Sequence, residues 1–362
     1  MTGLLVAFIA SLLCTFFIIR YEHLHQQFSG DNDLSGPQKV HIHAVPRIGG
    51  LSIAVGLVVS ALLSALIQEP KTESLLIILF CALPVFGIGL AEDLTKAIGI
   101  KTRLFFTAIS ALGVSYFLNA FITCLKIPGI DFLLLVPAIS IAFTCFAIAG
   151  LANAYNIIDG FNGLASMVAL ISLVGIAYVG ILVGDPLIAS LAFVMMGAIA
   201  GFFIWNYPRG LIFLGDGGSY LIGFWIATLS VLLVSRHQEI SPWFALMVNG
   251  YPIFETLFTI YRRKIHRGKN PGMPDAIHFH TLLFRRVLRP AHQNGLASLN
   301  YLANSRTSPY LWMLSGCAVI PAVLFWKSTP ILMICAALFA LAYIIMYKAI
   351  VRFKTPKWLH LF

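Results

Sequence analysis

Residues 187–205 read LIASLAFVMMGAIAGFFIW, a run of 19 residues without a charge. As an α-helix this run would be about 28 Å long, close to the roughly 30 Å hydrocarbon core of a bilayer. Eleven predominantly apolar stretches are candidate spans: 1–19, 48–67, 74–91, 104–122, 132–152, 164–183, 187–205, 220–234, 243–261, 310–326 and 331–350. The sequence therefore predicts an all-α polytopic membrane protein with one transmembrane domain over 1–362.

The composition agrees with this prediction. Of the 362 residues 59% are hydrophobic and only 10% are charged, whereas a soluble domain carries about 25% charged residues. A soluble enzyme, a disordered chain and a disulfide scaffold are thereby excluded. The six cysteines lie in or beside apolar stretches without a CxxC pair, so we expect packing residues and no cysteine metal site.

The basic residues indicate the orientation in the membrane. With the N-terminus outside, 20 of the 24 Lys and Arg fall in inward segments, including the loop at about 262–308. The positive-inside rule then predicts an outside N-terminus and a cytoplasmic C-terminus. Because topology explains most of the net charge of +10, we expect no nucleic-acid partner.

Acidic residues also gather on the inward side. The acids in inward loops or at inward span ends are Glu92, Asp93, Asp159, Asp216 and Asp275. A transporter or lipid flippase, the alternative of a different class, would place such groups near the midplane. The only acid inside a predicted span is Glu255, seven residues before Arg262 and so about 10 Å from the inner interface. We interpret Glu255 as a hydrogen-bonded residue that steadies its span, and the sidedness predicts an enzyme site at the cytoplasmic face.

The first cluster of polar residues is Glu92-Asp93, followed by Lys96, Lys101 and Arg103. Adjacent carboxylates point about 100° apart on a helix, so both need not bind one ion. Two acids with nearby lysines suit a metal–phosphate complex. A helix end carrying solvated charges is an equally good explanation of this cluster alone.

The second cluster is the stretch NAYNIIDGFNG at 153–163. Asn153 and Asn156 share a helix face, and Asp159 ends the same row. The glycines permit a tight turn and close approach of a ligand. Three amides and one carboxylate exceed what a capped helix terminus needs, which favours a binding site.

The third cluster is FLGDGGS at 213–219, directly before an apolar helix. Free N–H groups at a helix N-terminus favour phosphate, and Mg²⁺ takes one or two carboxylates together with phosphate oxygens. Asp216 is therefore a candidate Mg²⁺ ligand, with support from the other clusters on the same side.

The fourth cluster is PDAIHFH at 274–280, followed by Arg285 and Arg286. His278 and His280 are candidate metal ligands, proton carriers or hydrogen-bond donors to phosphate. No zinc motif is present, and for the two histidines alone a surface position is the better explanation.

Together, from the segment PRIGG at 46–50 to the loop with His278 and His280, these motifs resemble the polyprenyl-phosphate N-acetylhexosamine-1-phosphate transferase superfamily (glycosyltransferase family 4). The resemblance implies ten or eleven spans and a cytoplasmic active site. It also implies a reaction in which polyprenyl phosphate attacks the β-phosphorus of a UDP-amino sugar and UMP leaves. Mg²⁺, with Mn²⁺ as an alternative, is the implied cofactor.

The resemblance also implies residue roles. Asp216 would bind the metal ion, and Asp93, Glu92 and Asp159 would be catalytic, with Asp93 a base or a Mg²⁺ anchor. The implied substrate-binding residues are Arg47, Lys96, Lys101, Asn153, Asn156, Gly160, Phe161, Asn162, Asn206, Phe213, His278 and His280. Of these, Phe213 would stack on uracil, residues 160–162 would edge the uracil pocket, the lysines would meet phosphates, and the histidines would approach the diphosphate or the sugar.

Three positions depart from the family pattern. Glu92 replaces the first of two aspartates, Asn162 replaces an aspartate, and Thr281 replaces a third histidine. Thr281 and the segment Pro46-Arg47-Ile48 both argue against a muramyl-pentapeptide donor. They favour UDP-N-acetylglucosamine or a related UDP-HexNAc as the donor. A substrate-divergent or inactive homologue is the alternative within the family.

Several expectations concern the setting of the reaction. The product would initiate a cell-surface glycan such as O-antigen, capsule or teichoic acid. We expect a bacterial inner membrane, with the active site on its cytoplasmic face, and consider a homodimer as one possible assembly. The sugar, the polyprenyl length and the downstream polymer stay open.

Overall fold

The computed structural model describes residues 2–30, 45–266, 277–288 and 299–353. The first helices are α1 (Thr2–Arg20), α2 (Glu22–Ser29), α3 (Gly49–Leu66), α4 (Thr72–Thr95), α5 (Ile100–Phe117), α6 (Ile130–Leu134), α7 (Pro137–Ile158) and α8 (Leu164–Leu182). They are followed by α9 (Pro186–Asn206), α10 (Gly215–Arg236), α11 (Pro242–Val248), α12 (Gly250–Tyr261), η1 (Arg262–His266), α13 (Phe279–Leu283), η2 (Phe284–Leu288), α14 (Leu299–Leu324) and α15 (Thr329–Val351). Within the described residues the only β-type pairing is an isolated bridge between Gly30 and Pro46. The predicted all-α class is confirmed.

Nine helices of the described part are long and apolar enough to cross a membrane: α1, α3, α4, α7, α8, α9, α10, the 304–324 part of α14, and α15. The other two predicted spans, 104–122 and 243–261, correspond to α5 and to the pair α11 and α12. That pair is interrupted at Asn249, whose buried amide donates to Ser230 Oγ (3.2 Å) and accepts from the Tyr155 hydroxyl (3.1 Å). A break at membrane depth is tolerated because protein groups satisfy the polar atoms there.

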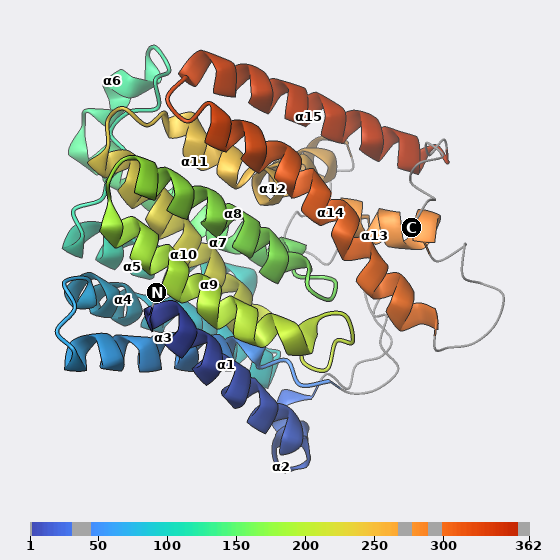
Figure 1. Cartoon of the computed structure of the whole chain (residues 1–362). Helices are drawn as coiled ribbons and strands as arrows, with labels where there is room; N and C mark the ends of the chain where they lie inside the picture. The colour runs from blue at the N-terminus through green and yellow to red at the C-terminus, as the bar shows by residue number, and fades with distance from the viewer. Residues whose placement is uncertain (1, 31–44, 267–276, 289–298, 354–362) are drawn as a thin grey trace.

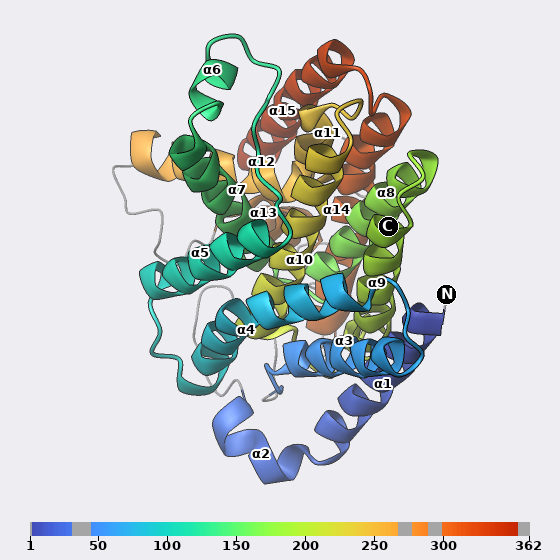
Figure 2. The same cartoon turned by 90° about the vertical axis from the view of Figure 1, so that its left-hand side faces the viewer.

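Helix α10 forms the centre of the bundle, between α4, α7, α3 and α8 (Figures 1 and 2). Its charged residues, Asp216 and Arg236, lie only at its two ends, and the residues between them are almost all buried. Gly50 lets α3 come very close to α10, since a Cβ at Gly50 would clash with the Gly218 backbone. Small residues at helix contacts are the usual means of close packing within a bilayer.

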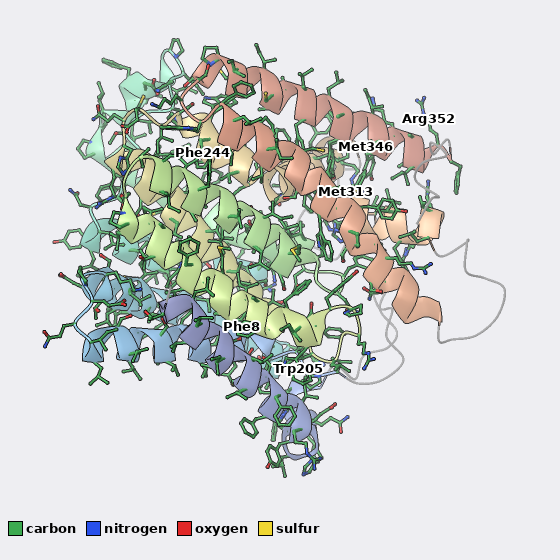
Figure 3. The ribbon with its side chains drawn as sticks, in the orientation of Figure 1. Phe8, Trp205, Phe244, Met313, Met346 and Arg352 are labelled. Carbon is green, nitrogen blue, oxygen red and sulfur yellow. The ribbon has the colours of Figure 1, made fainter. Side chains whose placement is uncertain are left out.

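Helix α1 lies at the edge of the bundle against α9 and α3. Phe8 and Trp205 mark this α1–α9 pair in Figure 3, and the Trp205 indole donates to the Leu12 carbonyl (3.2 Å). Large side chains such as Leu5 and Phe17 point away from the protein and are more than half exposed. An outward apolar surface of this kind fits contact with lipid.

Candidate active site

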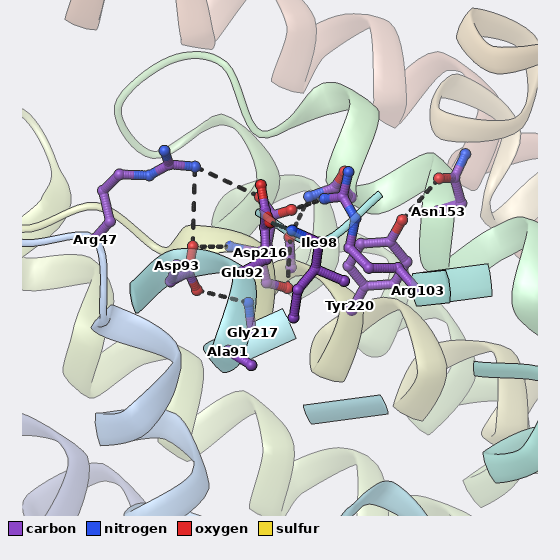
Figure 4. A network of polar contacts seen from close by, with 12 residues as sticks. Arg47, Ala91, Glu92, Asp93, Ile98, Arg103, Asn153, Asp216, Gly217 and Tyr220 are labelled. Atoms are coloured by element: carbon purple, nitrogen blue, oxygen red, sulfur yellow. Dashed lines mark hydrogen bonds and ion pairs between the residues drawn. The ribbon is translucent and has the colours of Figure 1, made fainter. Parts of the chain in front are cut away.

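The N-terminus of α10 is held by a carboxylate from the last turns of α4. Asp93 Oδ1 accepts the backbone N–H of Asp216 and Oδ2 accepts that of Gly217, both at 2.8 Å (Figure 4). Gly215 takes φ +76°, and a Cβ there would lie 2.6 Å from Asp93 Oδ2. The glycines of the third cluster therefore allow Asp93 to reach the first N–H groups of α10, where negative charge is favoured.

Two arginines face the Asp216 carboxylate at this helix end. Arg47 Nη2 lies 3.6 Å from Asp216 Oδ1 and 3.9 Å from Asp93 Oδ1. Arg103 pairs with the other Asp216 oxygen and also lies over the Tyr220 ring, 5.7 Å from its centroid. Two cations and two carboxylates thus meet at the start of one buried helix, an arrangement in which the arginines can bind phosphate once another cation takes over a carboxylate.

The segment with Arg47 is fixed in place by backbone hydrogen bonds to the loop before α10. The Phe213 N–H donates to the Pro46 carbonyl (2.8 Å), and the Phe213 carbonyl accepts from the Gly49 N–H (2.9 Å). The Phe213 side chain remains partly exposed. The sequence segment at 46–50 and the third cluster are therefore one structural unit.

The remaining residues of the first cluster shape the turn between α4 and α5. Glu92 Oε2 accepts the Ile98 N–H (2.6 Å), Lys96 ends α4 in a left-handed conformation, and Lys101 is exposed. Lys96 Nζ also lies 3.4 Å from the Gly30 carbonyl. Glu92 and Asp93 point to different partners, as expected for neighbours on a helix.

The predicted polar row on α7 faces the first turns of α10. Asn153 Oδ1 accepts from the Tyr220 hydroxyl (2.9 Å), and Asn156 Nδ2 donates to Ser219 Oγ (3.0 Å). Asp159 directly follows α7. Its partly exposed carboxyl is surrounded closely enough that burial raises its pKa to about 7, against the opposing effect of Arg47.

The loop after Asp159 is held by side chains from two distant helices. The Asn162 N–H donates to Asn304 Oδ1 (3.0 Å), and the Asn162 carbonyl accepts from Ser308 Oγ (2.6 Å). The next N–H, of Gly163, donates to Asn206 Oδ1 (2.6 Å). Asn162 and Asn206 are both buried. The Asn206 amide fixes the loop after Asp159, and the Asn162 amide donates to the Pro208 carbonyl (3.1 Å).

The histidine motif lies against the same loop. His280 stacks on His278 with ring centroids 5.2 Å apart, and it meets the Phe161 ring edge-on at 5.5 Å. A Cβ at Gly160 would lie 3.1 Å from His280 Nε2, so a side chain there would push the imidazole back by a few tenths of an ångström. The structure thus joins the second and fourth clusters, while Asp275 lies outside the described residues.

Glu255 is buried beneath the histidines and accepts hydrogen bonds from His278 Nδ1 (3.0 Å) and the Tyr343 hydroxyl (2.7 Å). The prediction that this acid is hydrogen-bonded within the protein is confirmed.

Some residues of the site were not predicted to belong to it. From the sequence, Arg103 stands out only as a charge beside the first cluster. Its position in the first turn of the following helix is a signal from which a place in the site could be inferred. Asn304 and Ser308 on α14 carried no such signal, because they lie more than 140 residues from the loop that they hold.

The donor set at the site indicates which kind of metal ion it suits. Within the described residues no three His, Cys, Asp or Glu side chains converge on one point. Asp216, with Asp93 beside it, instead offers one or two carboxylates, which matches an ion whose remaining ligands are water and phosphate oxygens.

Comparison with known proteins agrees with the motifs. Residues 75–234 match the family described as Glycosyl transferase family 4. A probable undecaprenyl-phosphate N-acetylglucosaminyl 1-phosphate transferase of Bacillus subtilis is 30% identical over 77% of this chain and 77% of its own length. An undecaprenyl-phosphate alpha-N-acetylglucosaminyl 1-phosphate transferase of Thermotoga maritima is 31% identical over 70% and 73% of the two chains. A phospho-N-acetylmuramoyl-pentapeptide-transferase of Streptococcus pneumoniae is 28% identical over 65% of this chain and 73% of its own.

The higher identities lie with the first two relatives, in agreement with the predicted branch. The chain therefore belongs to glycosyl transferase family 4, the polyprenyl-phosphate sugar-1-phosphate transferases, in the branch of the N-acetylglucosaminyl 1-phosphate transferases.

Proposed function

We propose that this protein transfers a HexNAc-1-phosphate, GlcNAc-1-phosphate in the first instance, from a UDP-sugar to undecaprenyl phosphate and releases UMP. The observation that carries the proposal is the convergence of Asp93, Asp216, Arg47 and Arg103 at the N-terminus of α10. The names of the Bacillus and Thermotoga relatives support the lipid acceptor and the sugar.

In this reaction an oxygen of the lipid phosphate forms a bond to the β-phosphorus of the donor, and the bond from that phosphorus to the UMP oxygen breaks. The acceptor is a phosphate monoester with a second pKa near 6, so it is largely dianionic at neutral pH and needs no strong base. Phosphoryl transfer depends mainly on positioning and charge neutralisation. Arg47 and Arg103 supply fixed positive charge for both tasks.

Asp216, with Asp93 beside it, would hold Mg²⁺ or Mn²⁺. The ion would neutralise charge on the donor diphosphate. Asn156 and Asp159 would face the nucleotide sugar, since they line the same end of α10. Phe213, whose side chain is partly exposed, would stack on the uracil ring.

The remaining proposals concern roles and setting. Lys96 and Lys101 would attract the phosphates, and His278 and His280 would contact the sugar diphosphate. We place the site on the cytoplasmic face of a bacterial inner membrane, where the product would start a cell-surface glycan.

The decisive test is UMP release by purified protein in detergent with undecaprenyl phosphate, Mg²⁺ and a panel of UDP-sugars. Acceptor-dependent UMP from one UDP-HexNAc, lost in Asp216→Asn and with EDTA, supports the proposal and identifies the donor. Glu239→Gln is the matched control, because it removes an acid that is half exposed and lies beyond the opposite end of α10. It should retain activity.

Failure with every donor would contradict the proposed reaction for the native chain. Activity that appears only after Glu92→Asp and Asn162→Asp would instead identify an inactive or substrate-divergent homologue. Transport that depends on Glu255 and ignores Mg²⁺ would favour the transporter alternative.

A further inference from the structure

Glu255 is a buried acid that the proposed reaction does not use. It lies on α12, in the second half of the interrupted helix pair, and its side chain is 1% exposed. A carboxylate buried in this way is costly unless hydrogen bonds satisfy its oxygens. Its partners therefore indicate why the chain keeps an acid at this position.

The partners come from two other parts of the chain. Glu255 Oε1 accepts from His278 Nδ1 (3.0 Å) and from the Phe279 N–H (3.3 Å) at the start of α13. Oε2 accepts from the Tyr343 hydroxyl (2.7 Å) on α15. Within α12, the Thr259 hydroxyl lies near both Oε1 (3.4 Å) and His278 Nδ1 (3.2 Å). One carboxylate thus connects α12, α13 and α15.

The hydrogen bond to His278 determines where that ring carries its proton. An ionised carboxylate only accepts hydrogen bonds, so His278 Nδ1 must be the donor. Nε2 is then the nitrogen left to meet a ligand, and the bond also fixes the plane of the ring. His278 is slightly more exposed than Glu255, with 10% of its side chain accessible.

The orientation of His278 is passed on to the candidate site. The His278 and His280 rings are nearly parallel, with 12° between their planes. His280 in turn lies against Gly160 and Phe161, which edge the expected nucleotide-sugar pocket. A change in the His278 ring would therefore affect contacts on the donor side of the site.

We propose that Glu255 is a positioning residue for the transfer reaction, which acts by holding His278 in the Nδ1–H form with Nε2 toward the sugar diphosphate. This inference rests on the proposed function. Carboxylates that orient metal-ligating histidines in this way typically contribute 10- to 100-fold in activity, and we take this as the guide for His278. Glu255→Gln, whose amide can donate to Nδ1 and so favour the other tautomer, should lower kcat/KM by about that factor.

A double-mutant cycle tests the proposal. If Glu255 acts through His278, Glu255→Gln should have almost no further effect in a His278→Ala background. Tyr343→Phe is the matched control, since it removes a hydrogen bond to the same carboxylate without touching the histidine. Its effect should be the same in both backgrounds. An equal loss from Glu255→Gln with and without His278 would overturn the proposal and leave Glu255 a packing role.

A readout independent of activity separates this proposal from the proposed function. NMR of protein labelled with ¹⁵N in its histidine rings reports which nitrogen carries the proton. A His278 signal, assigned by its loss in His278→Gln, should show Nδ1–H in the native protein and change in Glu255→Gln. An unchanged signal would refute the positioning role, even if no UDP-sugar proves to be a substrate. Thermal unfolding of each variant confirms that it is folded.

Discussion

Asp93→Asn should loosen the start of α10, because both oxygens of Asp93 accept backbone N–H groups there. The Asn oxygen can accept only one of these two bonds well, so one buried N–H is left unpaired at a cost of about 1–3 kcal/mol. The other bond loses its charge, which costs about 1 kcal/mol more. The free energy of unfolding should therefore fall by about 2–4 kcal/mol.

For a chain of this size such a loss corresponds to a melting temperature lower by about 3–5 °C. The assay is thermal unfolding in detergent followed by tryptophan fluorescence, with UMP release measured on the same samples. Glu92→Gln is the control, since the Gln oxygen can still accept the Ile98 N–H and the cost should stay below about 1.5 kcal/mol. The reasoning is refuted if Asp93→Asn melts within about 1 °C of the native protein, or if Glu92→Gln is destabilised as much.

Three further predictions concern other parts of the chain. Burial raises the pKa of Asp159 to about 7. If the reaction needs this carboxylate in its ionised form, the rate of UMP release should fall about tenfold per pH unit below 7. The pH profile of any residual activity in Asp159→Asn should instead follow the titration of the acceptor phosphate near pH 6. Identical pH profiles for this variant and the native protein would exclude a role for the ionised Asp159 carboxylate. Burial would raise the pKa of Asp185, but hydrogen bonds from His237 and Arg236 outweigh it and hold the pKa below its usual value. The Asp185 carboxylate therefore contributes about 1–3 kcal/mol to the free energy of unfolding above about pH 4, and this contribution is lost as the pH falls further. The melting temperatures of the native protein and Asp185→Asn should then converge in acid, and a difference that stays constant would contradict this. Gly50→Ala places a Cβ against the α10 backbone and should cost at least about 1–3 kcal/mol in thermal unfolding. Gly87→Ala, where a Cβ meets nothing within 4 Å, should not destabilise the protein.

Much of the site could be predicted from the sequence because its members form short motifs at the ends of the predicted spans. Asp216 with its glycines, the row from Asn153 to Asp159, and the histidine pair were all recognisable in this way. The structure brings these motifs together at one end of α10, with Asp93 and Arg47 beside them. Individual contacts were less predictable, since the side chains of Glu92 and Asn162 bond to backbone groups whose position depends on how the chain turns.

The membrane-spanning segments show the same contrast between features that the sequence predicts and features that depend on tertiary contacts. The predicted and observed helices agree closely where a long apolar run decides the outcome, as for residues 187–205 and α9. The predicted span at 243–261 is instead two helices, because Asn249 finds partners on α7 and α10 that compensate for the break. No local pattern shows whether such partners exist.

The sequence by itself therefore determined the class of the protein and the family motifs. The class follows from the free energy of transferring each residue between water and lipid, which is a local property, and each motif is a short stretch of neighbouring residues. Only the tertiary structure decided that Arg103 faces Asp216, that α14 holds the loop after Asp159, and that Glu255 orients His278. Those contacts join residues up to about 150 positions apart, and they exist only once the packing of α10 against its neighbours has set the distances between helices.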